Sequence, residues 1–423
     1  MSKQLLHTPE GARDIYNGEC EEKLFLQEKL QSAMKSYGYH NIETPTIEYF
    51  DVFSKEIGTI SSNELYKFFD REGNTLVLRP DITPSIARAC STVFADTLVP
   101  VRLCYTGNTF INHSSYRGRL REVTQMGAEL IGDSTADADA EIIAMTIDCL
   151  KASGLKEFQV SVGQMDFFRS LIEEADMDQE TEERLRDLIV NKNIFGVEEL
   201  VQEQNLPDTL KEVFFRLPEL FGGPEILLEA KNMAVNARGR EAIRRLAEIY
   251  NILRVYKMDS YLSFDLGMLG NYEYYTGVTI RAYTYGTGDY VITGGRYDNL
   301  LNKFGKDSPA IGFAIEVDEL MNALNRQRIP LTRGNEGVLM VYDEEVRSQA
   351  IKIARQLRGG NRSVELMPRN KDLEMEAYAD YAKNSRMTSL IYLDVSRRVT
   401  MKELDSGDSK TFSLEDLSGK ENK

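Results

Sequence analysis

Residues 101–132, VRLCYTGNTFINHSSYRGRLREVTQMGAELIG, constrain the fold more than any other stretch of this chain. The pattern predicts a strand, a polar loop and a second strand, and side chains that alternate along the second strand must fall on two different faces. The apolar face holds Leu120, Met126, Ala128 and Leu130, and the polar face holds Arg121, Gln125, Gly127 and Glu129. One face is therefore expected in the core, and the other needs a separate explanation.

The polar face has two interpretations. A guanidinium, an amide and a carboxylate, with Gly127 leaving open space between Gln125 and Glu129, would suit the floor of a pocket for a small zwitterion. Ordinary polar side chains on a solvent-facing strand produce the same pattern. This stretch alone does not separate the pocket from the solvent-facing strand.

The whole chain limits the class of protein. Its 423 residues are enough for two or three domains, and a net charge of −16 disfavours broad attraction to phosphate backbones. The four cysteines have no CxxC spacing and there are three histidines, so no structural metal site is expected. Residues 1–20 lack a signal pattern, and no apolar run approaches the roughly 18 residues that span a membrane. We therefore expect a cytoplasmic protein with reduced thiols.

A strand at 75–78 leads into the segment Arg79-Pro80-Asp81-Ile82-Thr83-Pro84, where the pattern predicts the start of a helix. Thr83 is placed to cap this helix, with Pro84 at its first position. Asp81 lies at the corner between strand and helix. It is expected either to contact a ligand or to accept hydrogen bonds from its own turn.

The remaining pattern indicates an α+β protein. Residues 160–255 are mostly helical, with clear helices at 173–189 and 239–256, and β-structure returns at 261–294. Residues 294–298, GGRYD, read as a tight turn into a helix, and residues 325–336 as an interdomain linker. From Val338 onward, alternating strands and helices predict a small α/β domain with a mainly parallel sheet.

Seven segments, in the same order, resemble the histidyl-tRNA synthetase family over nearly the whole chain. They are residues 11–14, the segment around Pro45, 79–83, 118–132, 274–277, 294–298 and 312–315. The resemblance implies a dimer with a class II synthetase core at residues 1–325, an antiparallel sheet flanked by helices. It also implies a helical insertion at about 165–255 and an anticodon-binding-like α/β domain at 337–423.

This chain differs from the family at the positions that contact ATP. Synthetases of this family use three arginines to hold negative charge through adenylate formation, and here those positions are Ile111, Gly270 and Glu319. His113 also replaces a family glutamate, and Glu316 a glycine. Losing one such donor commonly costs ~3 kcal/mol of transition-state stabilisation, so we expect no adenylate chemistry, no catalytic residue and no cofactor.

More of the family's residues are retained at the positions that contact the amino acid than at those that contact ATP. By resemblance, the residues that would bind histidine are Asp81, Thr83, Arg121, Gln125, Glu129, Tyr274 and Tyr275. The carboxylates and the amide would hold the α-ammonium, and the tyrosines would flank the imidazole. Arg121 is the best local substitute for the lost partners of the α-carboxylate. The alternative for the two tyrosines is aromatic packing in the core, which we expect of one of them.

A synthetase fold with a disabled ATP site and a retained amino-acid pocket resembles the regulatory subunits of ATP phosphoribosyltransferase, which are paralogues within this family. The resemblance implies a partner, the short catalytic subunit, which needs the regulatory subunit for activity in the first step of histidine biosynthesis. It also implies histidine feedback inhibition and a homodimer within a hetero-oligomer, commonly an octamer. Most such subunits end earlier than this chain, which keeps the domain after Val338.

Two alternatives remain open from the sequence. One is a divergent but active histidyl-tRNA synthetase, which would catalyse histidine-dependent ATP–pyrophosphate exchange. The other is a non-catalytic paralogue that binds tRNA or another protein. The acidic net charge disfavours tRNA only weakly, because an acidic protein can still carry a local basic patch.

Overall fold

The computed structural model describes residues 6–53, 60–113, 120–269, 275–331, 337–360 and 362–413. The chain divides into two compact units, one of Met1–Asp14 and Leu26–Pro330, the other of Ile15–Phe25 and Leu331–Lys423. Within the described residues, every helix is too short or too polar to cross a bilayer. The two units are described separately below.

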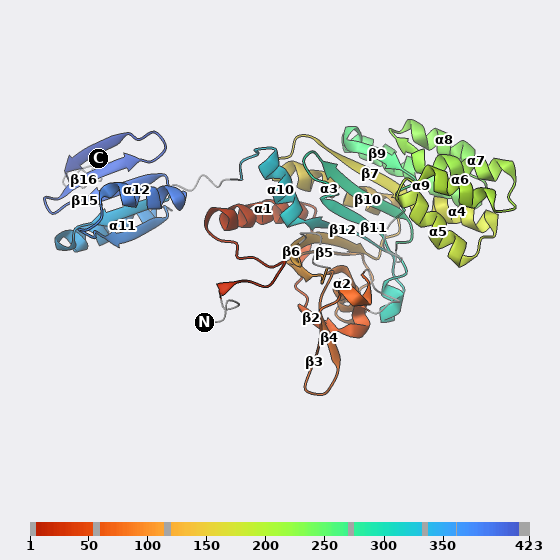
Figure 1. Ribbon diagram of the computed structural model, residues 1–423, viewed down its shortest axis with the longest axis horizontal. Helices are drawn as coiled ribbons and strands as arrows, with labels where there is room; N and C mark the ends of the chain where they lie inside the picture. The colour runs from red at the N-terminus through yellow and green to blue at the C-terminus, as the bar shows by residue number, and fades with distance from the viewer. Residues whose placement is uncertain are drawn as a thin grey trace. The chain divides into compact units, whose positions relative to one another are not determined.

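A nine-stranded sheet forms the centre of the first unit (Figure 1). In spatial order its strands are β1 (His40–Asn41), β5 (Val101–Phe110), β6 (Glu122–Ile131), β12 (Ala310–Glu316), β11 (Ile292–Arg296), β10 (Val278–Thr284), β7 (Phe158–Gln164), β9 (Leu262–Asp265) and β8 (Phe221–Gly222). Only the pairs β1–β5 and β7–β9 are parallel among the described strands of this sheet. The predicted antiparallel sheet is thus confirmed, with β6 and β12 near its middle.

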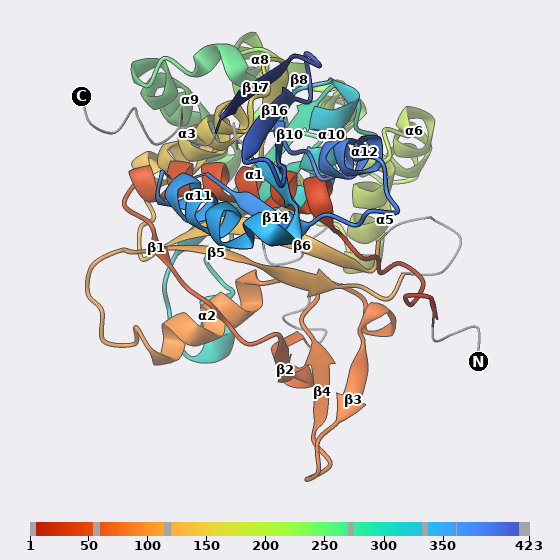
Figure 2. The same cartoon turned by 90° about the vertical axis from the view of Figure 1, so that its left-hand side faces the viewer.

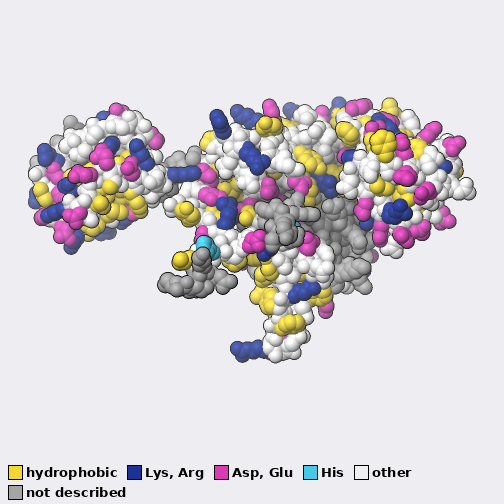
Figure 3. All heavy atoms as spheres, viewed as in Figure 1, with side chains coloured by type: hydrophobic (Ala, Val, Ile, Leu, Met, Phe, Trp, Pro, Cys, Tyr) yellow, Lys and Arg dark blue, Asp and Glu magenta, His cyan; other side chains and the backbone are white. Residues whose placement is uncertain are grey.

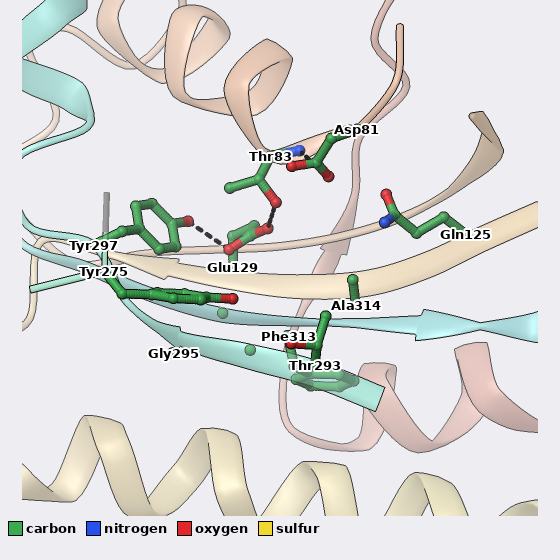
Figure 4. A pocket seen from close by; sticks show the side chains of 12 residues that line it. Asp81, Thr83, Gln125, Glu129, Tyr275, Thr293, Gly295, Tyr297, Phe313 and Ala314 are labelled. Carbon is green, nitrogen blue, oxygen red and sulfur yellow. Dashed lines mark hydrogen bonds between the residues drawn. The ribbon is translucent and has the colours of Figure 1, made fainter. Parts of the chain in front are cut away.

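Helices cover both faces of this sheet. The helices α1 (Asn17–Ser36), α3 (Ala136–Ser153) and α10 (Val317–Arg326) lie on one side, and α2 (Thr83–Thr92) lies on the other (Figures 1 and 2). The stripe of α1 that the spacing predicts is buried through Leu26, Leu30 and Met34. Residues 79–82 connect α2 to the strand β4 (Thr75–Leu78), and the first turn of α2 lies over the large sheet (Figure 4).

A second, smaller sheet of the first unit has the order β2–β4–β3. Its outer strands are β2 (Ile47–Tyr49) and β3 (Lys67–Phe69). One face buries Val77 against Val52, Phe53 and Leu65. On β2 the side chains of Ile47 and Tyr49, both about half exposed, point away from that core.

Residues 165–255 fold as six helices joined by short turns. They are α4 (Met165–Ala175), α5 (Gln179–Val190), α6 (Ile194–Gln202), α7 (Asp208–Arg216), α8 (Glu225–Met233) and α9 (Ala237–Val255). The prediction of one helix over 173–189 is wrong, because Asp176 adopts a left-handed conformation and Asp178 caps a new helix through the Thr181 amide at 2.9 Å. Within the insertion, β8 also contributes an edge strand to the large sheet.

The second unit contains a five-stranded sheet with the order β14–β13–β15–β16–β17. The strands are β13 (Val338–Tyr342), β14 (Val364–Pro368), β15 (Ser389–Leu393), β16 (Arg398–Glu403) and β17 (Ser409–Ser413), and the helices are α11 (Arg347–Gly359) and α12 (Met375–Asn384). The first three strands are parallel and the last two form an antiparallel hairpin. The predicted α/β alternation is confirmed.

Candidate functional site

A pocket of about 310 Å³ lies between the first turn of α2 and the strands β6, β11 and β12 (Figure 4). The lining residues are Asp81, Thr83, Gln125, Glu129, Tyr275, Thr293, Gly294, Gly295, Tyr297, Gly312, Phe313 and Ala314. The structure thus brings together five of the seven residues that the resemblance assigned to histidine.

Glu129 lies at one end of this pocket, almost fully buried. Thr83 Oγ1 donates a hydrogen bond to Glu129 Oε1 at 2.9 Å, and the Tyr297 hydroxyl donates to Oε2 (Figure 4). Burial nevertheless raises the pKa of Glu129 to about 8, and the negative charge of Asp81 adds to this shift. A buried carboxylate of this kind would be compensated by a cationic or proton-donating ligand.

Asp81 lies at the other end and serves its own turn, as one of the two interpretations expected. Its Oδ1 accepts hydrogen bonds from the amides of Ile82 at 2.7 Å and Thr83 at 3.4 Å. Burial raises the pKa of Asp81, while these bonds and one from the Gln125 side chain oppose that shift. The prediction that Thr83 caps α2 is wrong, because its hydroxyl is used by Glu129 and the capping position is Ile82.

Two glycine positions let the pocket close tightly. Gly312 pairs with Glu129 across β12 and β6, and a Cβ there would overlap the Glu129 carboxylate. A Cβ at Gly295 would lie 2.9 Å from the Tyr275 ring. Glycine is needed at these two positions for close approach of neighbouring groups. Residues 294–296 belong to the strand β11, so the predicted turn into a helix begins later, at residue 298, and leads into a short 3-10 helix (Leu301–Phe304).

The predicted open space above Gly127 is filled. Tyr105 is the partner of Gly127 across β5 and β6, and its hydroxyl lies where a Cβ of Gly127 would be. The expectation of free room at this position is therefore wrong, because side chains of directly opposed residues share a face of the sheet. Gln125 and Glu129 line the pocket, whereas Gly127 and Tyr105 are not among its lining residues.

Three of the residues predicted to bind histidine are not clearly available to a ligand in the pocket. Arg121 precedes β6 and is not among the pocket-lining residues, and its guanidinium lies 3.8 Å from the Glu10 carboxylate. Tyr275 is 5% exposed and its ring forms part of the pocket wall, so it is packed as well as available to a ligand. Tyr274 lies outside the described residues.

Arginines behind the pocket fix its wall to the helical insertion. Arg169 of α4 donates to the carbonyl oxygens of Tyr275, at 2.8 Å, and Thr276, at 3.2 Å. Asp139 of α3 is fully buried and accepts from Arg296 at 2.6 Å and from Arg245 of α9 at 2.8 Å. Since Arg296 directly precedes Tyr297, this ion-paired cluster holds the backbone that presents the Tyr297 hydroxyl to Glu129.

Sequence comparisons identify the family. The family model described as histidyl-tRNA synthetase matches residues 11–320. ATP phosphoribosyltransferase regulatory subunits from Acetivibrio thermocellus and Ruminiclostridium cellulolyticum are each 38% identical to this chain over 417 residues, which is 99% of both chains. The chain belongs to the family of ATP phosphoribosyltransferase regulatory subunits. The alignments with these two regulatory subunits extend through the C-terminal α/β unit.

Solved structures agree with this family. The structure of an ATP phosphoribosyltransferase regulatory subunit/histidyl-tRNA synthetase from Bacillus halodurans is 33% identical, with a TM-score of 0.83 over 92% of this chain and 98% of that chain. A histidyl-tRNA synthetase from Nostoc sp. is 18% identical, with a TM-score of 0.81 over 98% of each chain. At this identity the second similarity supports the class II synthetase fold alone.

The family resemblance assigns five positions to the ATP side of the site, and none of them is an arginine in this chain. Ile111 follows the end of β5, and His113 lies 3.5 Å from the carboxylate of Glu64. Glu319 is exposed in the first turn of α10, and Gly270 lies outside the described residues. Glu316 ends β12 directly opposite Gln125.

Sequence reasoning missed Tyr297, which lines the pocket, and Tyr105, which packs against Gly127. Tyr297 stands inside the GGRYD segment that contributes to the resemblance, but its role depends on the strand β11 bringing it to Glu129. Tyr105 could have been found from the sheet register, since it opposes Gly127. Neither position follows from local spacing.

Proposed function

We propose that this chain is the non-catalytic regulatory subunit of a short-form ATP phosphoribosyltransferase, and that its synthetase-like pocket binds histidine. One observation supports this proposal most directly. The residues that would contact the amino acid are retained, and the arginines that would contact ATP are replaced. Asp81 and Glu129 line one pocket, whereas Ile111 and Glu319 occupy positions where the family resemblance requires arginines. The regulatory-subunit name of the relatives at 38% identity supports the same conclusion.

The polar and aromatic groups that line the pocket suit histidine. Glu129, with Thr83 and Tyr297 already bonded to it, can accept a hydrogen bond from an imidazole N–H, and the Tyr275 ring supplies an aromatic wall. Asp81 and Gln125 offer oxygen and amide groups to the α-ammonium at the opposite end. Feedback control then requires that histidine bind with different affinity to two states of the complex.

A second copy of this chain is proposed to pair through the outer face of the three-stranded sheet. Ile47 is 48% exposed and Tyr49 is 58% exposed, and Figure 3 shows hydrophobic side chains on this sheet, in the lower part of the picture. Such exposed apolar side chains mark an interaction surface when they cluster. The substitution Tyr49→Glu should convert the dimer to a monomer, as light scattering would show.

Co-purification tests the proposed function. We expect the full chain to elute with the short catalytic subunit of the same organism as one hetero-oligomer, commonly an octamer, in the cytoplasmic fraction where amino-acid biosynthesis proceeds. Separate elution of the two proteins at micromolar concentrations, with and without histidine, would contradict the proposal. A synthetase would instead be revealed by histidine-dependent ATP–pyrophosphate exchange.

A further inference from the structure

A second cavity lies where the helical insertion meets the large sheet, and we call it the rear cavity. Its lining includes residues of α3, β7, α4, α9 and β11, among them Asp139, Gln164, Asp166, Arg245, Arg296 and Asp298. The volume, counted out to its open mouth, is about 630 Å³. Its described lining shares no residue with the histidine pocket, so the two are separate sites.

The rear cavity carries charges of both signs. Three arginines and four carboxylates are among its described lining residues. A ligand with negative charge alone would meet the carboxylates, and one with positive charge alone would meet the arginines, so like charges would oppose either in a partly enclosed site. A small molecule that carries both signs can match both sets of groups.

Gln164 provides the observation that points most directly to a ligand. The residue is 5% exposed, and its Oε1 caps α4 by accepting a hydrogen bond from the Asp166 amide at 3.3 Å. Its Nε2 donates to no acceptor among the described residues. Because buried amide groups are normally paired, this donor is available to a polar group in the rear cavity.

The neighbouring charged groups are also bonded on one side only. Arg245 uses Nε and Nη2 for acceptors near the start of α3, and its described hydrogen bonds leave Nη1 unused. Asp166 and Asp298 accept their described hydrogen bonds through Oδ1, which leaves Oδ2 of each unused. The rear cavity therefore offers two donors, from Gln164 and Arg245, and two carboxylate acceptors.

We propose that the rear cavity is a second ligand site, and that it binds a small zwitterion of the α-amino-acid class. The ligand carboxylate accepts hydrogen bonds from Gln164 Nε2 and Arg245 Nη1. The ligand ammonium donates to the unused oxygens of Asp166 and Asp298. Both charges of the ligand are thus met by groups that the fold already holds in place.

The rear cavity shares a wall with the histidine pocket. Thr276 and Arg296 line the rear cavity, whereas their chain neighbours Tyr275 and Tyr297 line the histidine pocket. The Thr276 amide donates to the Arg296 carbonyl at 2.7 Å, which joins the two segments. We therefore expect each ligand to change the affinity for the other, and the two changes must be equal. This coupling rests on the histidine pocket proposed above, whereas binding in the rear cavity does not.

Equilibrium dialysis of the full chain against a mixture of the standard L-amino acids, at equal millimolar concentrations, tests the binding. Wild type should retain one amino acid, histidine or another, through the rear cavity. Gln164→Glu keeps an oxygen to cap α4 and replaces the unused amide by an anion, so it should weaken that binding by about tenfold or more. Equal retention of every amino acid by wild type and Gln164→Glu would overturn the proposal.

Two further variants control this measurement. Gln202→Glu makes the same chemical change at an exposed position of α6 and should leave retention unchanged. Arg245→Lys keeps a positive charge beside Asp139 but removes the Nη1 donor, so it should reproduce the loss seen in Gln164→Glu. Thermal unfolding of each variant establishes that it is folded. Retention by Arg245→Lys at the wild-type level would also contradict the assigned site.

Calorimetric titration with histidine tests the coupling. If the retained amino acid is not histidine, its presence should shift histidine affinity by a few-fold. If it is histidine, wild type should bind two molecules per chain and Gln164→Glu only one. A histidine titration that is identical for wild type and Gln164→Glu, and unaffected by the retained amino acid, would overturn the coupling.

The outcomes separate this proposal from the proposed function. If Gln164→Glu changes no retention while Glu129→Gln abolishes histidine binding, the rear cavity fails and the histidine pocket stands. If retention depends on Gln164 while Glu129→Gln binds histidine as wild type does, the rear cavity stands and the histidine pocket fails. Activation of the catalytic subunit is measured separately and decides only the regulatory role.

Discussion

Thr83 and Glu129, 46 residues apart in the chain, are joined by a 2.9 Å hydrogen bond between Oγ1 and Oε1. This bond connects the first turn of α2 to the middle of the large sheet. It replaces the local capping bond that a threonine at a helix start would usually make. A residue that stabilises its own helix in most proteins here orients the buried acid of a pocket.

Removing this hydroxyl should weaken the pocket more than the fold. In Thr83→Val the Glu129 carboxylate loses one of its two donors, and we expect histidine affinity to fall by about tenfold, measured by calorimetry. Thr92→Val is the matched control, because Thr92 is exposed at the end of the same helix and bonds only to carbonyl oxygens of α2. Equal affinities for wild type and Thr83→Val would show that Glu129 does not contact the ligand.

Stability without ligand should fall as the pH rises. The folded-state pKa of Glu129 is about 8 and that of Glu316 about 7, both above the ordinary value for glutamate in an unfolded chain. Between pH 4.5 and 8 the unfolded chain therefore binds fewer protons than the folded chain, and the free energy of unfolding decreases. Glu316→Gln removes one of these groups, so its Tm relative to wild type should increase from pH 5 to pH 8. A constant difference in Tm would contradict the assigned burial.

Adenylate formation should be absent and should not return with one substitution. The charge that three arginines supply in the synthetases is missing at Ile111, Gly270 and Glu319, and each such donor is worth ~3 kcal/mol in the transition state. We expect no histidine-dependent ATP–pyrophosphate exchange from wild type or from Ile111→Arg. An active histidyl-tRNA synthetase serves as the positive control. Robust exchange by the wild-type chain would favour the divergent-synthetase alternative.

Asp139 should be the most sensitive position outside the pocket lining. Its carboxylate is fully buried and paired with Arg296 and Arg245. Asp139→Asn leaves these guanidinium groups without their shared anion, so the free energy of unfolding should fall by roughly 3 kcal/mol in urea titrations. Glu248→Gln removes an exposed ion pair with Arg244 on α9 and should change it by less than about 1 kcal/mol. Similar effects of both substitutions would argue against this assignment.

Local alternation predicted which side chains of β6 share a face, although it did not show that this face lines a pocket. Gln125 and Glu129 fall on the same face of β6 because the side-chain period of a strand is fixed at two, whatever the rest of the chain does. Asp81 was predicted from a different local signal, the change from a strand at 75–78 to a helix that starts at Thr83-Pro84. Each of these residues lines the pocket.

The rest of the site depends on which strands become neighbours. Gly127 has no side chain of its own, and only the register of β5 against β6 shows that Tyr105 fills its space. Gly294 and Gly295 suggested a turn, but they are strand residues that accommodate Phe313 and Tyr275. Long-range pairing of this kind has no local sequence signal, so spacing could not predict it.

The most direct test of this account is the rate of the short catalytic subunit as the full-length chain is titrated into it, with and without histidine. The account predicts that the phosphoribosyltransferase rate rises until the two chains are present in equal amounts. It also predicts that histidine then lowers the rate in the wild-type complex, and much less in a complex with Glu129→Gln. A rate that does not respond to this chain at any ratio would contradict the regulatory role itself.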